Sequence, residues 1–258
     1  MNYAPPLRGL ALDRDLKSAK AAYRRFLKVE REYATNLRRI ARHIADLVGG
    51  FDLTQPVSVE SLRTALEQYA NILGPWAESA AARMIAEVAR RDEKSWYEIG
   101  AQIGRSLKSE IADAPTGFAM RTLMQQQVSL ITSLPREAAE RVHALALEGM
   151  TVGQRPETLA RKILETGEVT KSRATLIART ETARAASVLS QVRAQSIGCT
   201  HFQWKTTGDS DVRPSHRALN GKTFRYDNPP ISDPPDKRSL PGQIWNCRCV
   251  AFPIIPEV

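Results

Sequence analysis

The chain has 258 residues, 42% of them hydrophobic and 25% charged, a balance typical of folded proteins, so intrinsic disorder is not expected. No apolar run is long enough to cross a bilayer, and the N-terminus lacks the pattern of a signal peptide, so we expect a protein made in the cytoplasm. The formal net charge is +9, and eleven Lys and Arg against four Asp and Glu between Arg8 and Arg42 give that segment an excess of +7.

Residues 13–48 are predicted to form one long amphipathic helix. Apolar side chains such as Leu37 and Ile44 recur at steps of three, four and seven, and Gly49 ends the pattern. We expect the cations of this helix to contact DNA or an acidic protein surface, with a solvated helix face as the alternative. These cations are Arg24, Arg25, Lys28, Arg31, Arg38, Arg39 and Arg42.

Helical periodicity continues almost to residue 198, in segments that proline and glycine separate. Pro135 and Pro156 are placed in the first turns of two helices, and Thr170 is expected to cap the last one. A break is expected at residues 113–117. The predicted helices are residues 59–73, 76–111, 118–133, 135–149, 156–167 and 171–198.

After residue 198 the sequence becomes rich in β-branched and aromatic residues, which is typical of strands. Residues 229–241 hold five prolines and are expected to be irregular. Strands are predicted at residues 199–207, 221–227 and 247–255.

The predicted fold class is mainly α, with long amphipathic helices followed by a small C-terminal α+β module of few strands. We expect an N-terminal helical region (1–112), central helices (113–198) and the C-terminal module (199–258). A module of this size has a thin core, so it needs support from the helices or from a metal.

A carboxylate interrupts the apolar arc of the helix predicted at residues 171–198. On a helical wheel Glu181 lies among Ile177 and Ala185, with Arg184 one turn further on. A buried unpaired carboxylate is costly, so Glu181 must find a partner. Either it reaches into the C-terminal module, or it lies at a rim paired with Arg184. A catalytic carboxylate is a third alternative.

The C-terminal module carries the side chains with ligand chemistry. Cys247 and Cys249 form a CxC pair, and with His216 they supply the ligand types that zinc prefers. We expect no cofactor, but a structural zinc ion on these three residues stays open. The candidates for a fourth ligand are Asp209, Asp211 and His201.

The alternative to a metal is that the two cysteines alternate with Arg248 along a strand and pack inward as small apolar side chains. His216 would then bond to a loop carbonyl or to Glu181. Trp204 and Trp245 are both expected in the core of the module. We also expect a polar network made of Glu181, Arg184, Arg213 and His216.

Three stretches together resemble the phage Mu F-type family of minor head, or head morphogenesis, proteins, over roughly residues 120–258. They are "IARTETARA" at 177–185, "FQWKTTGDSDVRPSHRALNGKTF" at 202–224 and "PGQIWNCRC" at 241–249. The resemblance implies a minor capsid protein of a tailed bacteriophage, placed in the virion at the capsid interior or portal vertex and assembled in the host cytoplasm. No established catalytic activity comes with the family domain.

The resemblance also implies partners: the portal protein, the major capsid protein, or double-stranded DNA bound without sequence preference. No membrane contact is expected, and the virion would set the oligomeric state. Two other functions stay open. One is a small hydrolase or transferase that uses Glu181, His216 and the two cysteines; the other is a sequence-independent DNA-binding protein. We expect a protein that is not an enzyme, because catalytic groups belong in solvent-reachable clefts and these residues also suit structural roles.

Overall fold

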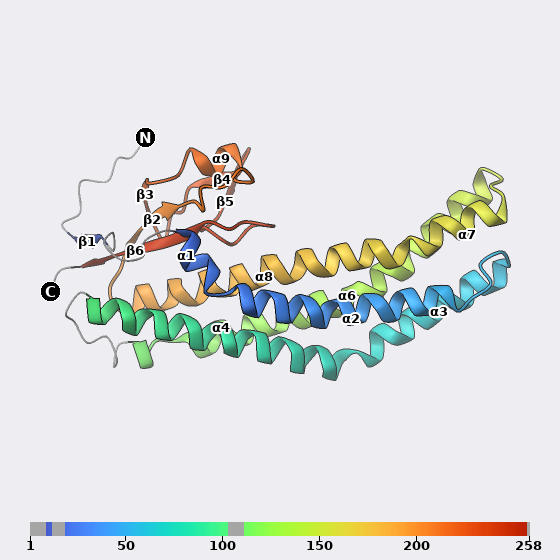
Figure 1. The fold of residues 1–258 in the computed structure, drawn as a ribbon, viewed down its shortest axis with the longest axis horizontal. Helices are drawn as coiled ribbons and strands as arrows, with labels where there is room; N and C mark the ends of the chain where they lie inside the picture. Colours follow the sequence, from blue (N-terminus) through green and yellow to red (C-terminus); the bar gives the residue numbers. More distant parts are fainter. Residues whose placement is uncertain (1–8, 12–18, 103–110, 257–258) are drawn as a thin grey trace. The chain divides into compact units, whose positions relative to one another are not determined.

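The computed structural model describes residues 9–11, 19–102 and 111–256 and confirms a mainly helical chain with a small module of antiparallel strands near its C-terminus (Figure 1). The helices are α1 (Ala19–Arg24), α2 (Leu27–Gly49), α3 (Pro56–Ile72), α4 (Gly74–Gln102), α6 (Thr116–Thr151), α7 (Pro156–Leu164), α8 (Thr166–Ser196) and α9 (Pro214–Arg217). The strands are β1 (Gly9–Ala11), β2 (His201–Lys205), β3 (Thr223–Arg225), β4 (Ile231–Asp233), β5 (Lys237–Arg238) and β6 (Val250–Pro256).

The helix predicted over residues 13–48 is two helices, α1 and α2, and its first residues lie outside the described part of the chain. The break falls at Arg25. The carbonyl of Arg25 accepts a hydrogen bond from Arg91 Nη1 at 2.8 Å, and the guanidinium of Arg25 pairs with Glu98 at 3.4 Å. These contacts with α4 replace helix continuation, which the periodicity of one segment cannot reveal.

The break predicted between residues 133 and 135 is also wrong, because α6 runs through Pro135. Proline removes the backbone donor that would bond to the carbonyl of Ile131, four residues earlier, and the hydroxyls nearby bond to other carbonyls of the same turns. Thr132 donates to the carbonyl of Val128 at 3.0 Å, and Ser133 donates to that of Leu130 at 2.9 Å. Burial of the side chains around the proline then keeps the helix continuous.

Thr170 does not cap a helix, because α8 begins earlier, at Thr166. The hydroxyl of Thr170 donates to the carbonyl of Thr166 at 2.8 Å, inside the helix. Gly167 was predicted to end the preceding helix, yet it lies in the first turn of α8. A Cβ added there would stand 2.6 Å from the Cβ of Ala45 in α2, so this glycine serves close packing of two helices.

The chain forms two compact units whose boundaries differ from those of the three consecutive domains predicted. The sheet unit comprises residues 1–30, 84–123 and 179–258, and the helical unit comprises residues 31–83 and 124–178. Each is assembled from separate segments, because α2, α4, α6 and α8 all contribute residues to both units.

The helical unit has a core of apolar side chains from its several helices. Tyr33 contributes its ring to this core, and its hydroxyl donates to Gln127 Oε1 at 2.9 Å. The bonded hydroxyl avoids the cost of a buried unsatisfied polar group. The most buried apolar members include Leu37, Ile40, Ile44, Leu62, Leu66 and Ile131.

The sheet unit contains a four-stranded antiparallel sheet in the order β1-β6-β2-β3, whose last three strands are orange to red in Figure 1. β1 was not predicted. A second, two-stranded sheet pairs β4 with β5, so the stretch expected to be irregular contains a short hairpin. A register shift between Ile231 and Asp233 interrupts that hairpin and explains why no strand pattern is visible in its sequence.

The core of the sheet unit is shared between helices and strands, so the helices provide one of the two kinds of support expected for the C-terminal module. Trp96 and Ile99 of α4 and Ala194 of α8 share one buried cluster with Phe202 and Trp204 of β2. The three cysteines are free thiols, and Cys199 belongs to the same cluster. Within the described residues, no helix combines the length and apolar character required to span a bilayer.

Candidate functional site

The two cysteines of the CxC pair lie in a loop, residues 239–249, which we name the closing loop. It connects β5 to β6, so the predicted alternation of Cys247 and Cys249 along a strand is wrong. Two left-handed residues explain why the loop cannot extend: Gly242 has a φ of +84° and Asn246 a φ of +58°. The cysteines are therefore placed by turns.

Three side chains of α8 hold the closing loop. Arg184 donates from Nε and Nη2 to the carbonyl of Gln243 at 3.1 and 3.0 Å. The backbone N–H of Asn246 donates to Thr180 Oγ1 at 3.0 Å, and Arg179 Nη1 donates to Asn246 Oδ1 at 3.0 Å. Two of the stretches that carry the family resemblance, 177–185 and 241–249, are thus bonded to each other.

Gly242 is the point of closest approach between the loop and α8. A Cβ there would lie 3.3 Å from the carbonyl oxygen of Ala183 and 3.4 Å from that of Cys249. Its backbone N–H donates to Cys247 Sγ at 3.4 Å. A glycine is therefore needed for its left-handed backbone and for the narrow space beside the helix.

Glu181 is fully buried, at 0% exposure, and pairs with Arg184 across 3.1 Å. The predicted pairing with Arg184 is present, but the carboxylate is not at a rim. Arg184 is only partly buried and also holds the Gln243 carbonyl. The carboxylate therefore fixes the guanidinium that fastens the closing loop to α8.

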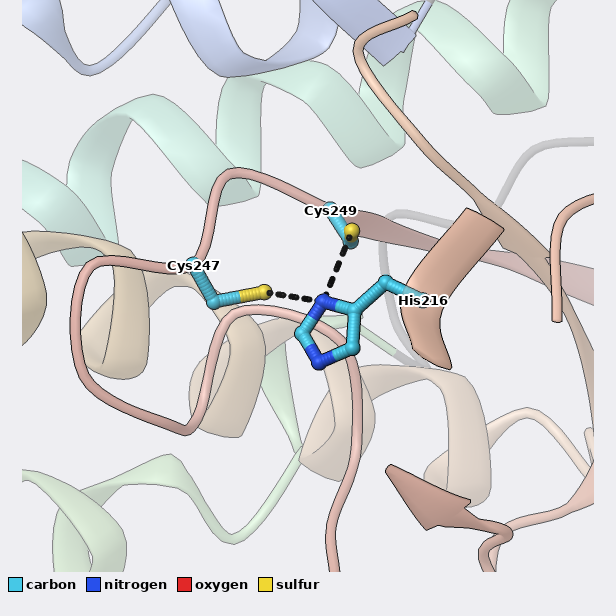
Figure 2. Close-up of side chains that lie close together, drawn as sticks. All are labelled: His216, Cys247 and Cys249. Atoms are coloured by element: carbon cyan, nitrogen blue, oxygen red, sulfur yellow. Dashed lines mark hydrogen bonds between the residues drawn. The ribbon is translucent and has the colours of Figure 1, made fainter. Parts of the chain in front are cut away.

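His216 and the two cysteines form one buried cluster (Figure 2). His216 Nδ1 lies 3.5 Å from Cys247 Sγ and 3.5 Å from Cys249 Sγ. The three side chains are 2%, 3% and 6% exposed, and their ligand atoms lie within 4.8 Å of one another. α9 positions the histidine, and Trp204 of β2 meets its ring edge-on at a centroid distance of 5.2 Å.

The two thiols influence each other strongly. A hydrogen bond from Cys249 lowers the pKa of Cys247 to about 4 against the effect of burial, and His216 adds to this lowering. The same interaction and burial raise the pKa of Cys249, while the nearby Trp204 side chain opposes that rise. Of the two coupled thiols, Cys247 is therefore the more acidic.

Arg248, between the two cysteines, binds the loop that precedes α9. Its Nη2 lies 2.9 Å from Asp209 Oδ1 and 2.8 Å from Asp211 Oδ2. Both carboxylates, considered as fourth ligands, thus pair with a guanidinium instead. His201, the other candidate, has its Nδ1 2.8 Å from Thr200 Oγ1. None of the three belongs to the metal-capable cluster found among the described residues.

The predicted polar network is divided among separate contacts. Glu181 pairs with Arg184, and His216 contacts the cysteines. Arg213 donates to the backbone carbonyl of Trp245 at 2.8 Å. Trp204 is buried as predicted, but Trp245 is 38% exposed, so its assignment to the core is wrong. Its carbonyl holds Arg213, while the loop directs neighbouring Ile244 into the core.

The predicted cationic contact residues fall in both units. Arg24, Lys28, Arg31, Arg39 and Arg42 are exposed. Arg25 is partly buried and already engaged with Glu98 and Ser95, so its charge holds the break between α1 and α2 against α4 within the sheet unit. In the helical unit, Arg38 and Arg42 of α2 and Lys171 of α8 line a hollow of about 330 Å³, together with Glu168.

Sequence reasoning missed the structural use of the hydroxyl of Thr180. Its position four residues before Arg184 places both side chains on one helix face and could have signalled a polar contact there. The left-handed residues of the closing loop gave a weaker signal, because Gly242 and Asn246 both tolerate such backbone.

Comparison with known proteins identifies the region that carries this site. Residues 140–252 match the family described as "Phage Mu protein F like protein". A protein of Haemophilus influenzae described as uncharacterized is 28% identical over 208 residues, which are 78% of this chain and 44% of that protein. The chain thus spans less than half of that relative's length. No solved structure matches.

Proposed function

We propose that this chain is a minor capsid protein of a tailed bacteriophage, a structural component of the virion that acts in head morphogenesis near the portal, because residues 140–252 match the family described as "Phage Mu protein F like protein". The family match is the observation that carries this proposal. It covers α7, α8 and the closing loop, and therefore every contact by which α8 holds that loop.

The geometry of the site supports a structural role over an enzymatic one. Glu181 and His216 are 0% and 2% exposed, and each is engaged by neighbouring side chains. Catalytic groups need access to substrate, whereas structural polar groups are buried and bonded. The same residues fasten the closing loop to α8 and α9.

The partner surface that we propose is the exposed side of α2 in the helical unit. Arg31, Arg39 and Arg42 are exposed there, and the hollow beside them adds Arg38 and Lys171. Such a surface attracts an acidic partner. We assign it to a protein of the head, the portal or the major capsid protein, and treat packaged DNA as the competing outcome.

Substitution tests this surface better than deletion, because α2 also supplies the buried residues Tyr33 and Leu37. The triple variant Arg31→Gln, Arg39→Gln, Arg42→Gln should fold normally yet be depleted from purified heads, measured by quantitative mass spectrometry of virions. The control variant Arg121→Gln, Arg136→Gln, Arg161→Gln removes three other exposed charges and should be incorporated normally.

Three results of these experiments would change the proposal. Absence of the wild-type chain from purified heads would overturn the proposed function itself. Normal incorporation of the α2 variant would remove that face as the contact. Retention of double-stranded DNA by the purified protein, steeply salt-dependent and lost in the α2 variant alone, would assign the face to DNA.

A further inference from the structure

The distances in the cluster of His216, Cys247 and Cys249 match those of a zinc site. Zinc binds thiolate at about 2.3 Å and imidazole nitrogen at about 2.0–2.1 Å in a tetrahedron, so a ligand sulfur and a ligand nitrogen stand about 3.6 Å apart. Here Nδ1 lies 3.5 Å from each sulfur. Both nitrogen–sulfur distances of such a tetrahedron are therefore already present, and all three ligand atoms lie within 4.8 Å of one another.

The surroundings of the sulfurs suit bound thiolates. The backbone N–H of Gly242 donates to Cys247 Sγ at 3.4 Å. N–H donors directed at ligand sulfur are a usual outer layer of a metal site, because they hold the ligand in orientation. The loop supplies this donor through a left-handed glycine, so the backbone itself is shaped around the sulfur.

The histidine is oriented as a ligand. Its Nδ1 faces both sulfurs, as Figure 2 shows, whereas its Nε2 is buried and makes no hydrogen bond within the described part of the chain. A neutral imidazole that ligates through Nδ1 carries its proton on Nε2. Trp204 packs edge-on against the ring and restricts its rotation.

The donor set selects the metal. Two thiolates and one imidazole are soft or borderline ligands that suit zinc, while magnesium and calcium prefer oxygen. The carboxylates nearest in sequence, Asp209 and Asp211, face Arg248 instead. Neither sulfur is suited to attack a substrate from its present position, since the two cysteines are 3% and 6% exposed.

We propose that His216, Cys247 and Cys249 bind one zinc ion that fastens the closing loop to α9, with water or a small anion in the fourth position. The ion would join two segments more than twenty residues apart in sequence and supplement the thin core of the C-terminal module. This site does not depend on the proposed role in the head, because its test needs only the purified chain.

The experiment combines metal content with optical spectroscopy. The full chain, purified without added metal or chelator, should carry one zinc ion per chain by inductively coupled plasma mass spectrometry. Replacement by Co²⁺ should give thiolate-to-cobalt charge-transfer absorption together with the strong visible bands of four-coordinate cobalt. Removal of the metal by a chelator should lower the Tm.

Variants locate the ion. Cys247→Ser, Cys249→Ser and His216→Gln should each lose the zinc and weaken or abolish the cobalt spectrum. The matched controls Cys199→Ser and His201→Gln change a buried cysteine and a buried histidine outside the cluster and should retain both. Should a ligand variant fail to fold, the wild-type metal content and cobalt spectrum still decide the question.

Three results would overturn the proposal. The first is a folded wild-type chain that is free of metal and gives no thiolate-to-cobalt absorption when Co²⁺ is added. The second is zinc that dialysis removes with no change in Tm, which would mark it as adventitious. The third is a ligand variant that folds and retains its metal.

Discussion

Gly242 combines a left-handed backbone with close contact to α8, and Gly208 offers a comparison at the same scale. Both have positive φ, +84° and +74°, but a Cβ at Gly208 would meet nothing within 4 Å. A left-handed backbone costs a non-glycine residue about 1–2 kcal/mol at either position. Only at Gly242 is there a further steric cost, of about 1–3 kcal/mol.

Gly242→Ala should therefore lower the free energy of unfolding by about 2–5 kcal/mol, and Gly208→Ala by about 1–2 kcal/mol. Urea denaturation of the two variants and the wild type measures the difference. Equal losses would show that the closing loop can move away from Ala183 without cost and is held less firmly than its contacts indicate.

For single residues, the sequence identified some of the buried polar side chains but not the partners that they contact in distant segments. The helical wheel singled out Glu181 and gave pairing with Arg184 as one of its alternatives, because both lie on one helix. It did not reveal the buried ion pair between Asp92 and Arg193, which joins α4 to α8 across 101 positions. Burial raises the pKa of Asp92 to about 6, with Arg193 opposing the rise. Local periodicity carries no information on such contacts.

At the level of the helices, α8 approaches α2 so closely at Gly167 that there is no space for a Cβ atom. An added Cβ would lie 2.6 Å from that of Ala45, so Gly167→Ala should cost about 1–3 kcal/mol despite the better helix propensity of alanine. Gly117, also the second residue of its helix, has only a flexible arginine within 4 Å.

Gly117→Ala should therefore be neutral or stabilise the protein by up to about 1 kcal/mol. Thermal denaturation followed by circular dichroism at the helical signal compares the two variants. A neutral Gly167→Ala would mean that α2 and α8 can separate by the needed distance without losing burial.

Helices were easier to predict than their ends. The long apolar stripes located most of the helical residues, and α3 differs from its prediction by only a few residues. The errors at Arg25, Pro135 and Thr170 share one cause. Contacts with other helices decide where a helix ends. They broke the helix at Arg25 without a local signal, and they kept helices continuous where Pro135 and Thr170 indicated a boundary. The sequence of a single segment does not encode such contacts.

Helices and strands share the core of the sheet unit. We therefore expect the helical part of that unit to lose stability when the C-terminal module is removed. A fragment of residues 1–198 should lose the partners of Trp96 and Ile99, namely Phe202 and Trp204. It should bind a hydrophobic dye and lose hydrogen-exchange protection in α4 beyond Met84. The part of α6 beyond Leu123, which belongs to the helical unit, should stay protected.

Hydrogen exchange with mass spectrometry on the fragment and the full chain tests this expectation within one molecule. Unchanged protection of α4 in the fragment would instead support the three consecutive domains predicted from the sequence. Those domains followed the change in composition at residue 198. The units of the structure follow burial, and burial brings together segments that are far apart along the chain.

The pairing of β1 with β6 has a topological consequence. Gly9 lies opposite Pro256, so the first described strand begins directly beside the point where the last described strand ends. A segment fused directly to Gly9 and one fused directly to Pro256 would therefore start side by side. Joined by a short linker, the two strands would become a hairpin, and the chain would become a ring that can be cut elsewhere, as in circular permutation.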